Sequence, residues 1–312
     1  DDGGEVKAIG CGGVELVVDC LRVHRAEKDV CFGGCWVLAN LSCSEAGRVK
    51  ALDCGGVEAV MECLQVHRAD KDVCRGICRA LNNLVSSEAG ELKALDCGGV
   101  EAVVECLRVH REDKHVCFEG SLTLHYLGFT QAGKAKVIAC RGVEAVIDCL
   151  RVHRMDRDVC DVSCMALHRL LFSDAGKCKL IDCGGVEAVI ECLQTHNADN
   201  DVCGRSCWML GHMSSSEAGR AKVIACGGVE AVVDCLRVHR AEKDVCLGGC
   251  WALGSVSFSD AGKCKVIDCG GVEAVMECLQ VHRADKDVCS RSCLMLARMT
   301  FSEPGEAKAI AC

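Results

Sequence analysis

Paired cysteines separated by three residues recur along the chain, and this spacing could supply part of a metal site. Cys31 with Cys35 and Cys160 with Cys164 are two such pairs. On a helix the pair places two thiols on one face, one turn apart. Zinc normally takes four ligands. His24 could add only a third, and the spacing matches no zinc-finger pattern. We therefore expect no metal and no other cofactor.

A histidine recurs in the same column of all seven copies of a repeat: His24, His67, His110, His153, His196, His239 and His282. Histidine titrates near neutral pH, so such a column could sense pH. We interpret it instead as a cap at the end of a helix, with the neighbouring Arg25-type arginines beside the negative end of the helix dipole. The chain contains no G-x-S-x-G, no P-loop and no H-E-x-x-H. It is therefore not expected to be an enzyme.

The repeat itself is 43 residues long and continues without insertion or deletion. Its register is marked by cysteines at positions 11, 54, 97, 140, 183, 226, 269 and 312. A fixed period of this length indicates a stacked array. We expect one armadillo-like repeat domain over residues 1–312, with complete repeats at 11–53, 54–96, 97–139, 140–182, 183–225, 226–268 and 269–311. Both ends fall inside a repeat, so we expect the chain to be a fragment of a longer array.

The chain has 31 cysteines, and 28 of them fall in the four columns of Cys11, Cys20, Cys31 and Cys35. A disulfide framework is disfavoured by this distribution and by the odd total. Cysteine packs as a small hydrophobic residue, so we interpret these residues as core. An intracellular, reducing setting, and the cytoplasm in particular, follows as an expectation.

Each repeat is predicted to contain three helices. In the first repeat, Gly12 and Gly13 break the chain, because glycine tolerates the positive φ of a tight turn. Helices are then expected over Val14–Val23, Glu27–Ser42 and Glu45–Asp53. Acidic residues should favour the start of the second of these helices, and Ser44 should cap the last. Val37 should lie in the apolar stripe of the longest helix, and Val49 and Leu52 should face inward on the last.

Charge and hydrophobicity argue against two further classes, nucleic-acid-binding proteins and membrane-spanning proteins. The net charge is −9, with no basic run, which disfavours nucleic acid as a partner. No segment reaches 18 consecutive apolar residues, so no membrane span is expected.

The segments ACGGVEAVVDCL at 225–236 and DVCFGGCWVLANLS at 29–42 resemble the armadillo repeat. HEAT repeats are a near neighbour, but they usually have two helices per repeat. The resemblance implies an all-α, right-handed α-solenoid whose third helices line a concave groove that binds extended peptides or partner proteins. It does not extend to nuclear-import members, in which tryptophan and asparagine recur together. Here only the first repeat keeps both, as Trp36 and Asn40, and the second keeps only Asn83.

The columns that vary between repeats map to one face of the predicted third helix. They are those of Phe32, Gly33, Trp36, Ala39, Asn40 and Cys43, and we call them the variable face. Fixed columns, such as those of Gly13, Glu15 and Gly47, are interpreted as scaffold. The variable face carries six arginines against two acidic residues, a balance of about +4, and all three tryptophans. Arginine and tryptophan are enriched in interface hot spots.

We therefore predict a protein-interaction scaffold that binds a neutral or acidic extended segment. The expected groove residues are Trp36, Asn40, Arg79, Asn83, Tyr126, Met165, Arg169, Arg205, Trp208, His212, Trp251 and Arg298. Three alternatives stay open: a solvent face that drifted after duplication, an element that self-associates through its solenoid ends, and a cysteine-rich metal or redox store.

Overall fold

The computed structural model describes residues 2–300, which form 21 α-helices. Those residues contain no strand. The short helices are α1 (Asp2–Gly10), α4 (Glu45–Asp53), α7 (Glu88–Asp96), α10 (Gln131–Ala139), α13 (Asp174–Asp182), α16 (Glu217–Ala225) and α19 (Asp260–Asp268). The middle helices are α2 (Gly13–Val23), α5 (Gly56–His67), α8 (Gly99–Val109), α11 (Gly142–Val152), α14 (Gly185–Thr195), α17 (Gly228–Val238) and α20 (Gly271–Val281). The third helices are α3 (Lys28–Leu41), α6 (Lys71–Leu84), α9 (Lys114–Leu127), α12 (Arg157–Leu170), α15 (Asn200–Met213), α18 (Lys243–Val256) and α21 (Lys286–Thr300).

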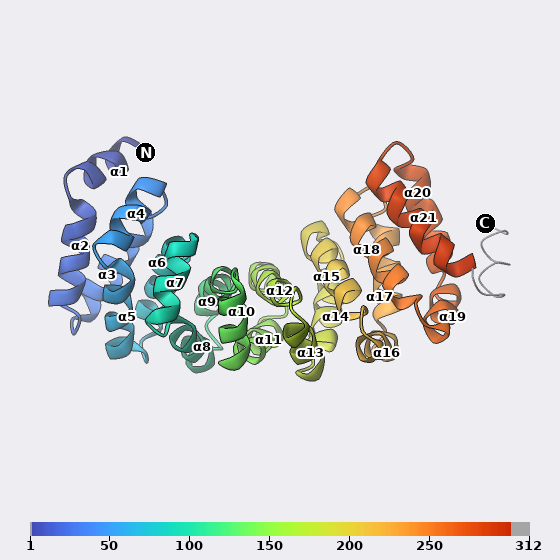
Figure 1. Cartoon of the computed structure of the whole chain (residues 1–312), viewed down its shortest axis with the longest axis horizontal. Coiled ribbons are helices and arrows are strands. Elements are labelled where there is room, and N and C mark those ends of the chain that lie inside the picture. Colours follow the sequence, from blue (N-terminus) through green and yellow to red (C-terminus); the bar gives the residue numbers. More distant parts are fainter. Residues whose placement is uncertain (1, 301–312) are drawn as a thin grey trace. The chain divides into compact units, whose positions relative to one another are not determined.

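Figure 1 shows these helices in chain order, and they divide into two compact units. The N-terminal unit comprises the residues up to His153 together with Met165–Leu170, and the C-terminal unit comprises Arg154–Cys164 and the residues from Leu171 onward. The single domain expected from the repeat stays a prediction. The register mark at Cys312 and the end of the last repeat lie outside the described residues.

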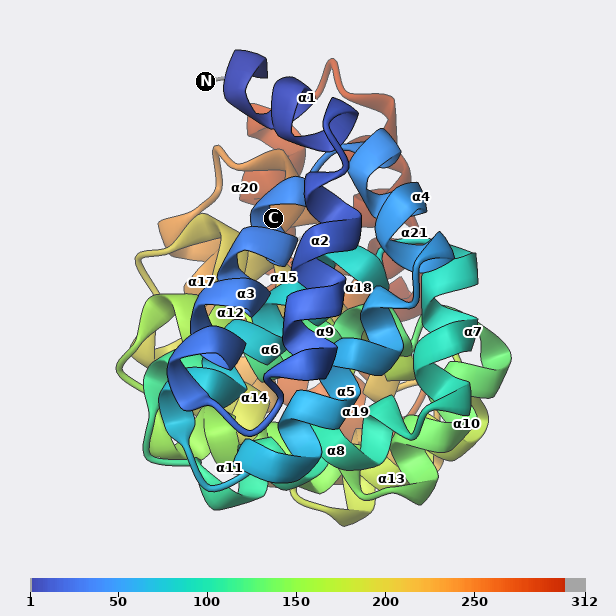
Figure 2. The ribbon, with the colours of Figure 1, turned by 90° about the vertical axis from the view of Figure 1, so that its left-hand side faces the viewer.

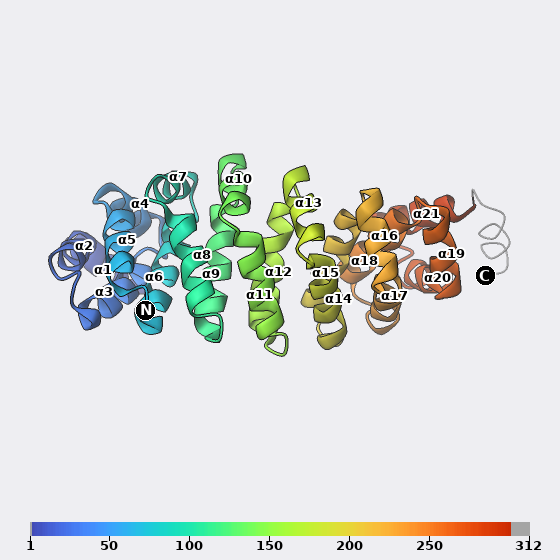
Figure 3. The ribbon, with the colours of Figure 1, turned by 90° about the horizontal axis from the view of Figure 1, so that it is seen from below.

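Within each unit, helices pack against neighbours in the same repeat and against helices of the same kind in the next repeat, and they enclose an apolar core. Figure 2 shows α2 and α3 side by side, and Figure 3 shows the same for α8 with α11 and for α14 with α17. In the first repeat, Val14, Leu21 and Leu38 are fully buried. Leu52 is buried as predicted, but Val37 and Val49 are 44% and 49% exposed. The prediction for these two valines was wrong, since each lies on the outer side of its helix.

The helix starts follow the sequence chemistry. The Ser44 hydroxyl accepts a hydrogen bond from the Gly47 amide at 3.3 Å, and the same cap recurs at Ser87, Thr130, Ser173, Ser216 and Ser259. Its equivalent Ser302 lies outside the described residues. Asp70 caps α6 by accepting from the amides of Asp72 and Val73. Glu27 occupies the N-cap position of α3 without a side-chain cap bond.

The expected turn with positive φ precedes each middle helix, and a glycine provides it in every repeat but the fourth. Gly12 has φ 79°, and the equivalent residues have positive φ throughout the described chain. In the fourth repeat this residue is Arg141, at φ 64°. A side chain in this conformation costs about 1 kcal/mol. Glycine recurs at Gly47 and its equivalents for a different reason, which is lack of space. A Cβ at Gly47 would overlap the carbonyl oxygen of Leu41.

The histidine column connects neighbouring repeats. The ring Nε2 of His67 lies 2.9 Å from the carbonyl oxygen of Arg25, 42 residues earlier. The same bond joins His110 to Arg68 and His282 to Arg240. The expectation that the ring caps its own helix was wrong; the backbone N–H of the histidine makes that contact instead. The carbonyl oxygen can only accept, so Nε2 is the donor in each of these bonds.

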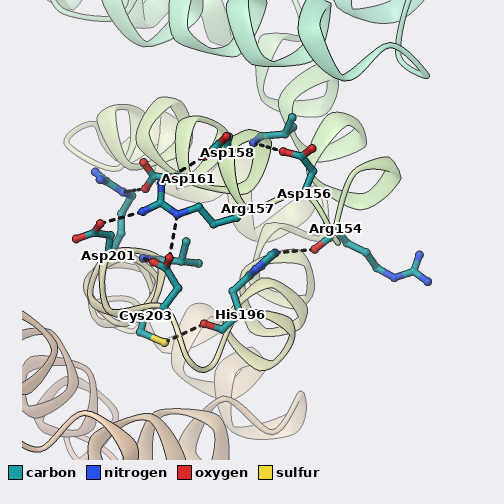
Figure 4. Close-up of polar contacts among 12 residues, drawn as sticks. Arg154, Asp156, Arg157, Asp158, Asp161, His196, Asp201 and Cys203 are labelled. Atoms are coloured by element: carbon teal, nitrogen blue, oxygen red, sulfur yellow. Dashed lines mark hydrogen bonds and ion pairs between the residues drawn. The ribbon is translucent and has the colours of Figure 1, made fainter.

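Ion pairs between repeats accompany the histidines. The Lys28 ammonium lies 2.7 Å from the Asp70 carboxylate, and Lys243 lies 2.8 Å from Asp285. Arg157 occupies the lysine position in the fourth repeat and contacts both Asp199 and Asp201 at 2.9 Å (Figure 4). Within residues 2–300, no helix is both long enough and apolar enough to cross a membrane.

Candidate functional site

The twelve predicted groove residues all lie on third helices, and each is at least partly exposed. Five of them belong to α3, α6 and α9, and Met165 and Arg169 come from the end of α12 in the same unit. Arg205, Trp208, His212, Trp251 and Arg298 belong to the C-terminal unit. Some of these residues contact one another, and others form hydrogen bonds or ion pairs with residues of neighbouring repeats.

In the N-terminal unit, Trp36 lies beneath two arginines. The guanidinium carbons of Arg79 and Arg75 are 4.4 Å and 5.4 Å from the centroid of the indole ring. Arg79 also forms an ion pair with Glu119 at 3.6 Å. Its charge is therefore balanced from within the protein while its guanidinium lies over the tryptophan ring.

A buried polar network beside this cluster was missed by the sequence reasoning. The Asn82 amide donates to the Glu119 carboxylate at 2.7 Å, and the Thr123 hydroxyl donates to the Asn82 carbonyl oxygen at 2.6 Å. Burial raises the pKa of Glu119, although Arg79 and Arg75 oppose the shift. The available signal was Thr123, because its position in the repeat is apolar in every other repeat.

Asn83 does not offer a free amide donor. Its Nδ2 donates to the carbonyl oxygen of Ala39 at 2.6 Å and to Cys43 Sγ at 3.3 Å. Tyr126 packs edge-on against His125. Arg169 approaches the His125 ring nitrogen at 3.3 Å and lies 4.7 Å from the Phe129 centroid. These residues form a second stacked cluster in the N-terminal unit.

In the C-terminal unit, an aromatic cluster joins α15 and α18. The ring centroids of Trp208 and Trp251 are 6.4 Å apart, and His212 lies 6.3 Å from Trp208 and 6.1 Å from Trp251. Glycines make this packing possible: a Cβ at Gly211 would overlap the Trp251 ring, and one at Gly248 would lie 3.0 Å from Trp208 Cδ1. Burial lowers the pKa of His212, and the charges of Lys177 and Arg291 add to the effect. The imidazole therefore favours the neutral form.

Three arginines of the variable face in this unit have different partners. Arg205 donates from Nε to Asp161 at 2.9 Å, beside the Arg157 contacts shown in Figure 4. Arg291 lies over both tryptophans, with its guanidinium carbon 4.7 Å from the Trp251 centroid and 5.6 Å from that of Trp208. Arg298 stacks on Phe258 at 4.0 Å. Arg291 belongs to the variable face, but the twelve predicted residues did not include it.

The cysteines behave mainly as packing residues. Cys35, Cys63 and Cys78 are fully buried, and burial raises the pKa of Cys63 to about 12. The 30 cysteines in the described part of the chain are free thiols, and no cluster there could hold a metal ion. The first column was wrongly assigned to the core, because Cys11 is exposed and Cys54 and the later described equivalents are half-buried at helix ends.

Comparison with known proteins fixes the architecture. No protein-family model and no curated protein matches the chain. A chain from a solved structure concerning the phosphorylation-controlled interaction between cadherin and β-catenin matches with a TM-score of 0.84 at 16% identity. That match covers 98% of this chain and 56% of the other, so this chain spans just over half of its length. The fold is an all-α solenoid.

An engineered protein of known crystal structure is also similar, with a TM-score of 0.68 at 22% identity over 78% of this chain and 96% of that one. The predicted fold class is confirmed, and the solenoid is close to an armadillo-repeat structure. Chemically, the variable face offers stacked guanidinium groups and partly exposed indole rings. Such a surface suits recognition of a partner by contact and hydrogen bonding.

Proposed function

We propose that the chain is a protein-interaction scaffold that binds an extended partner segment along the variable face of its third helices. The observation that carries this proposal is the Trp208–His212–Trp251 cluster, in which glycines on facing helices hold two indole rings at a partly exposed surface. Large aromatic side chains at a surface favour contact with another molecule. The other predicted groove residues, from Trp36 to Arg298, extend the proposed surface within each unit.

Exposed phenylalanines support the same role. Phe129 and Phe258 are each 60% exposed, and Phe172 is 55% exposed. All three lie just beyond the ends of third helices, beside the clusters described above. A face that had drifted as free solvent surface would be expected to carry mostly small polar residues, so these aromatic residues favour a binding role.

A peptide-display selection tests the proposal. Random peptides would be selected on the wild-type chain and then measured against the Trp208→Ala/Trp251→Ala variant. The matched control is Val238→Ala/Val281→Ala, which truncates two exposed apolar residues on middle helices of the same unit. We expect selected peptides to bind the control as they bind wild type and to lose about tenfold or more in affinity for the tryptophan variant. Equal binding to both variants would refute the proposed surface.

End-to-end association is a second candidate, favoured by one observation at the first repeat. Leu16 is 64% exposed and Cys20 is exposed, whereas the equivalent Ala59 and Cys63 of the next repeat are buried beneath their neighbours. A second copy could cover this apolar face as a preceding repeat would. Light scattering should then show a mass that rises with concentration and that Leu16→Ser reduces. A constant monomer mass would exclude this candidate.

A further inference from the structure

We propose that Arg291 and Arg298 of α21 form a carboxylate anchor, and that the segment bound by the C-terminal unit is an acidic peptide. This inference rests on the proposed function and names the chemistry of the bound segment. The anchor is defined by these two arginines and by the rings of Trp208, Trp251 and Phe258 that support them.

Aromatic rings hold both guanidinium groups in place. The two arginines are seven residues apart on one helix, so they project from the same face. Arg291 lies 4.7 Å from the Trp251 centroid, and Arg298 lies 4.0 Å from the Phe258 centroid. Gly254 gives Arg298 room, because a Cβ there would lie 2.9 Å from its Nη1. Less side-chain entropy is therefore lost when a ligand binds.

Stacking leaves the hydrogen-bond donors of a guanidinium available. A guanidinium carries five N–H donors in its plane, so a carboxylate can accept from two of them while a ring lies over the guanidinium face. Neither arginine forms an ion pair with a carboxylate among residues 2–300. Burial and the nearby charge of Arg291 lower the pKa of Arg298. An anion bound between the two arginines would relieve this repulsion.

Two other arginines of the variable face already form ion pairs with carboxylates. Arg79 pairs with Glu119, and Arg205 pairs with Asp161. Arg169 directs Nη2 toward His125. No described carboxylate of the C-terminal unit forms an ion pair with Arg291 or Arg298, and a carboxylate is the group that complements their charge.

Single-stranded nucleic acid is the competing class of ligand, because bases also stack on aromatic rings and arginines. It requires a basic groove along its phosphate backbone. The chain instead has a net charge of −9, and only two arginines are available at this cluster. The negative net charge therefore favours a peptide over a nucleic acid, because acidic side chains of a peptide need to contact positive charge only at the two arginines.

The experiment is a fluorescence-anisotropy titration with labelled deca-glutamate, with a Gly-Ser peptide and oligo-dT of equal length as alternative probes. The test variant is Arg291→Gln/Arg298→Gln. The control is Arg240→Gln/Arg283→Gln, which removes the same charge from exposed arginines in loops of the same unit. Arg291→Lys/Arg298→Lys keeps the charge but removes the planar fork.

We expect deca-glutamate to bind the wild type more tightly than either other probe. The glutamine variant should bind at least about tenfold more weakly, the lysine variant should recover part of the loss, and the control should remain within about threefold of wild type. An equal loss in the control, or tighter binding of oligo-dT or of the Gly-Ser peptide, would overturn the inference. If deca-glutamate does not bind while neutral selected peptides still require Trp208 and Trp251, the anchor fails but the scaffold stands. If no selected peptide binds, the scaffold fails as well.

Discussion

Replacing Gly90 with alanine should destabilise the protein strongly, because this glycine lies where α7 meets the end of α6. A Cβ at Gly90 would overlap the carbonyl oxygen of Leu84 and lie 2.8 Å from its carbonyl carbon and 3.2 Å from the Cα of Val85. These atoms belong to the backbone and cannot rotate away. Overpacking of this kind costs about 3 kcal/mol. Displacing the Gly90 amide from Ser87 costs about 1 kcal/mol more.

Alanine also has the better helix propensity, which offsets about 1 kcal/mol of this cost. The net expectation is a loss of about 3 kcal/mol, or a fall of about 1 M or more in the urea midpoint followed by circular dichroism. Gly33→Ala is the matched control, because its Cβ would meet no atom within 4 Å in the interior of α3. That variant should gain about 0.5–1 kcal/mol. A Gly90→Ala midpoint equal to wild type, or an equal loss in Gly33→Ala, would refute the packing argument.

Three further predictions follow from the same contacts. Thr123→Val should cost about 1–3 kcal/mol in urea unfolding, because it removes the hydroxyl that donates to buried Asn82; an unchanged midpoint would contradict the network. The Asp285 pKa is lowered from 3.8 to about 2, with the Lys243 hydrogen bond as the largest cause, so its stabilising contribution is present above pH 4 and is lost as pH falls toward 2. Asp285→Asn, which keeps a capping side chain, should flatten acid unfolding in that range, and an unchanged acid profile would count against this assignment. In a thiol-labelling assay, the exposed Cys11, Cys20, Cys43, Cys178, Cys264 and Cys293 should react quickly and the buried cysteines only after unfolding; uniform labelling would contradict the assigned burial.

The fold was largely predictable because each repeat restates the same local signals. Ser44 and its equivalents define helix starts, and Gly12 defines a turn. Both features depend on residues close in sequence. The exposed valines Val37 and Val49 were mistaken because apolar character at helical spacing does not say which side of a helix meets the next repeat.

The site was less predictable, because its chemistry depends on contacts between repeats. The sequence places arginines on the variable face, but only the structure shows that Arg205 meets Asp161 and that Arg291 meets two tryptophans. The partner of each arginine lies about one or two repeats away. Which charges are balanced depends on where each side chain extends in the structure, and the position of the residue in the repeat does not determine this.

Intrinsic tryptophan fluorescence tests the central claim most directly, because Trp36, Trp208 and Trp251 are the only tryptophans in the chain and all lie on the variable face. A display-selected peptide that lacks tryptophan would be titrated into the protein, with binding followed independently by anisotropy of a label on the peptide. The account predicts that indole emission changes in parallel with anisotropy and saturates at the same peptide concentration. Saturable binding by anisotropy with indole emission unchanged would place the partner elsewhere and contradict the account.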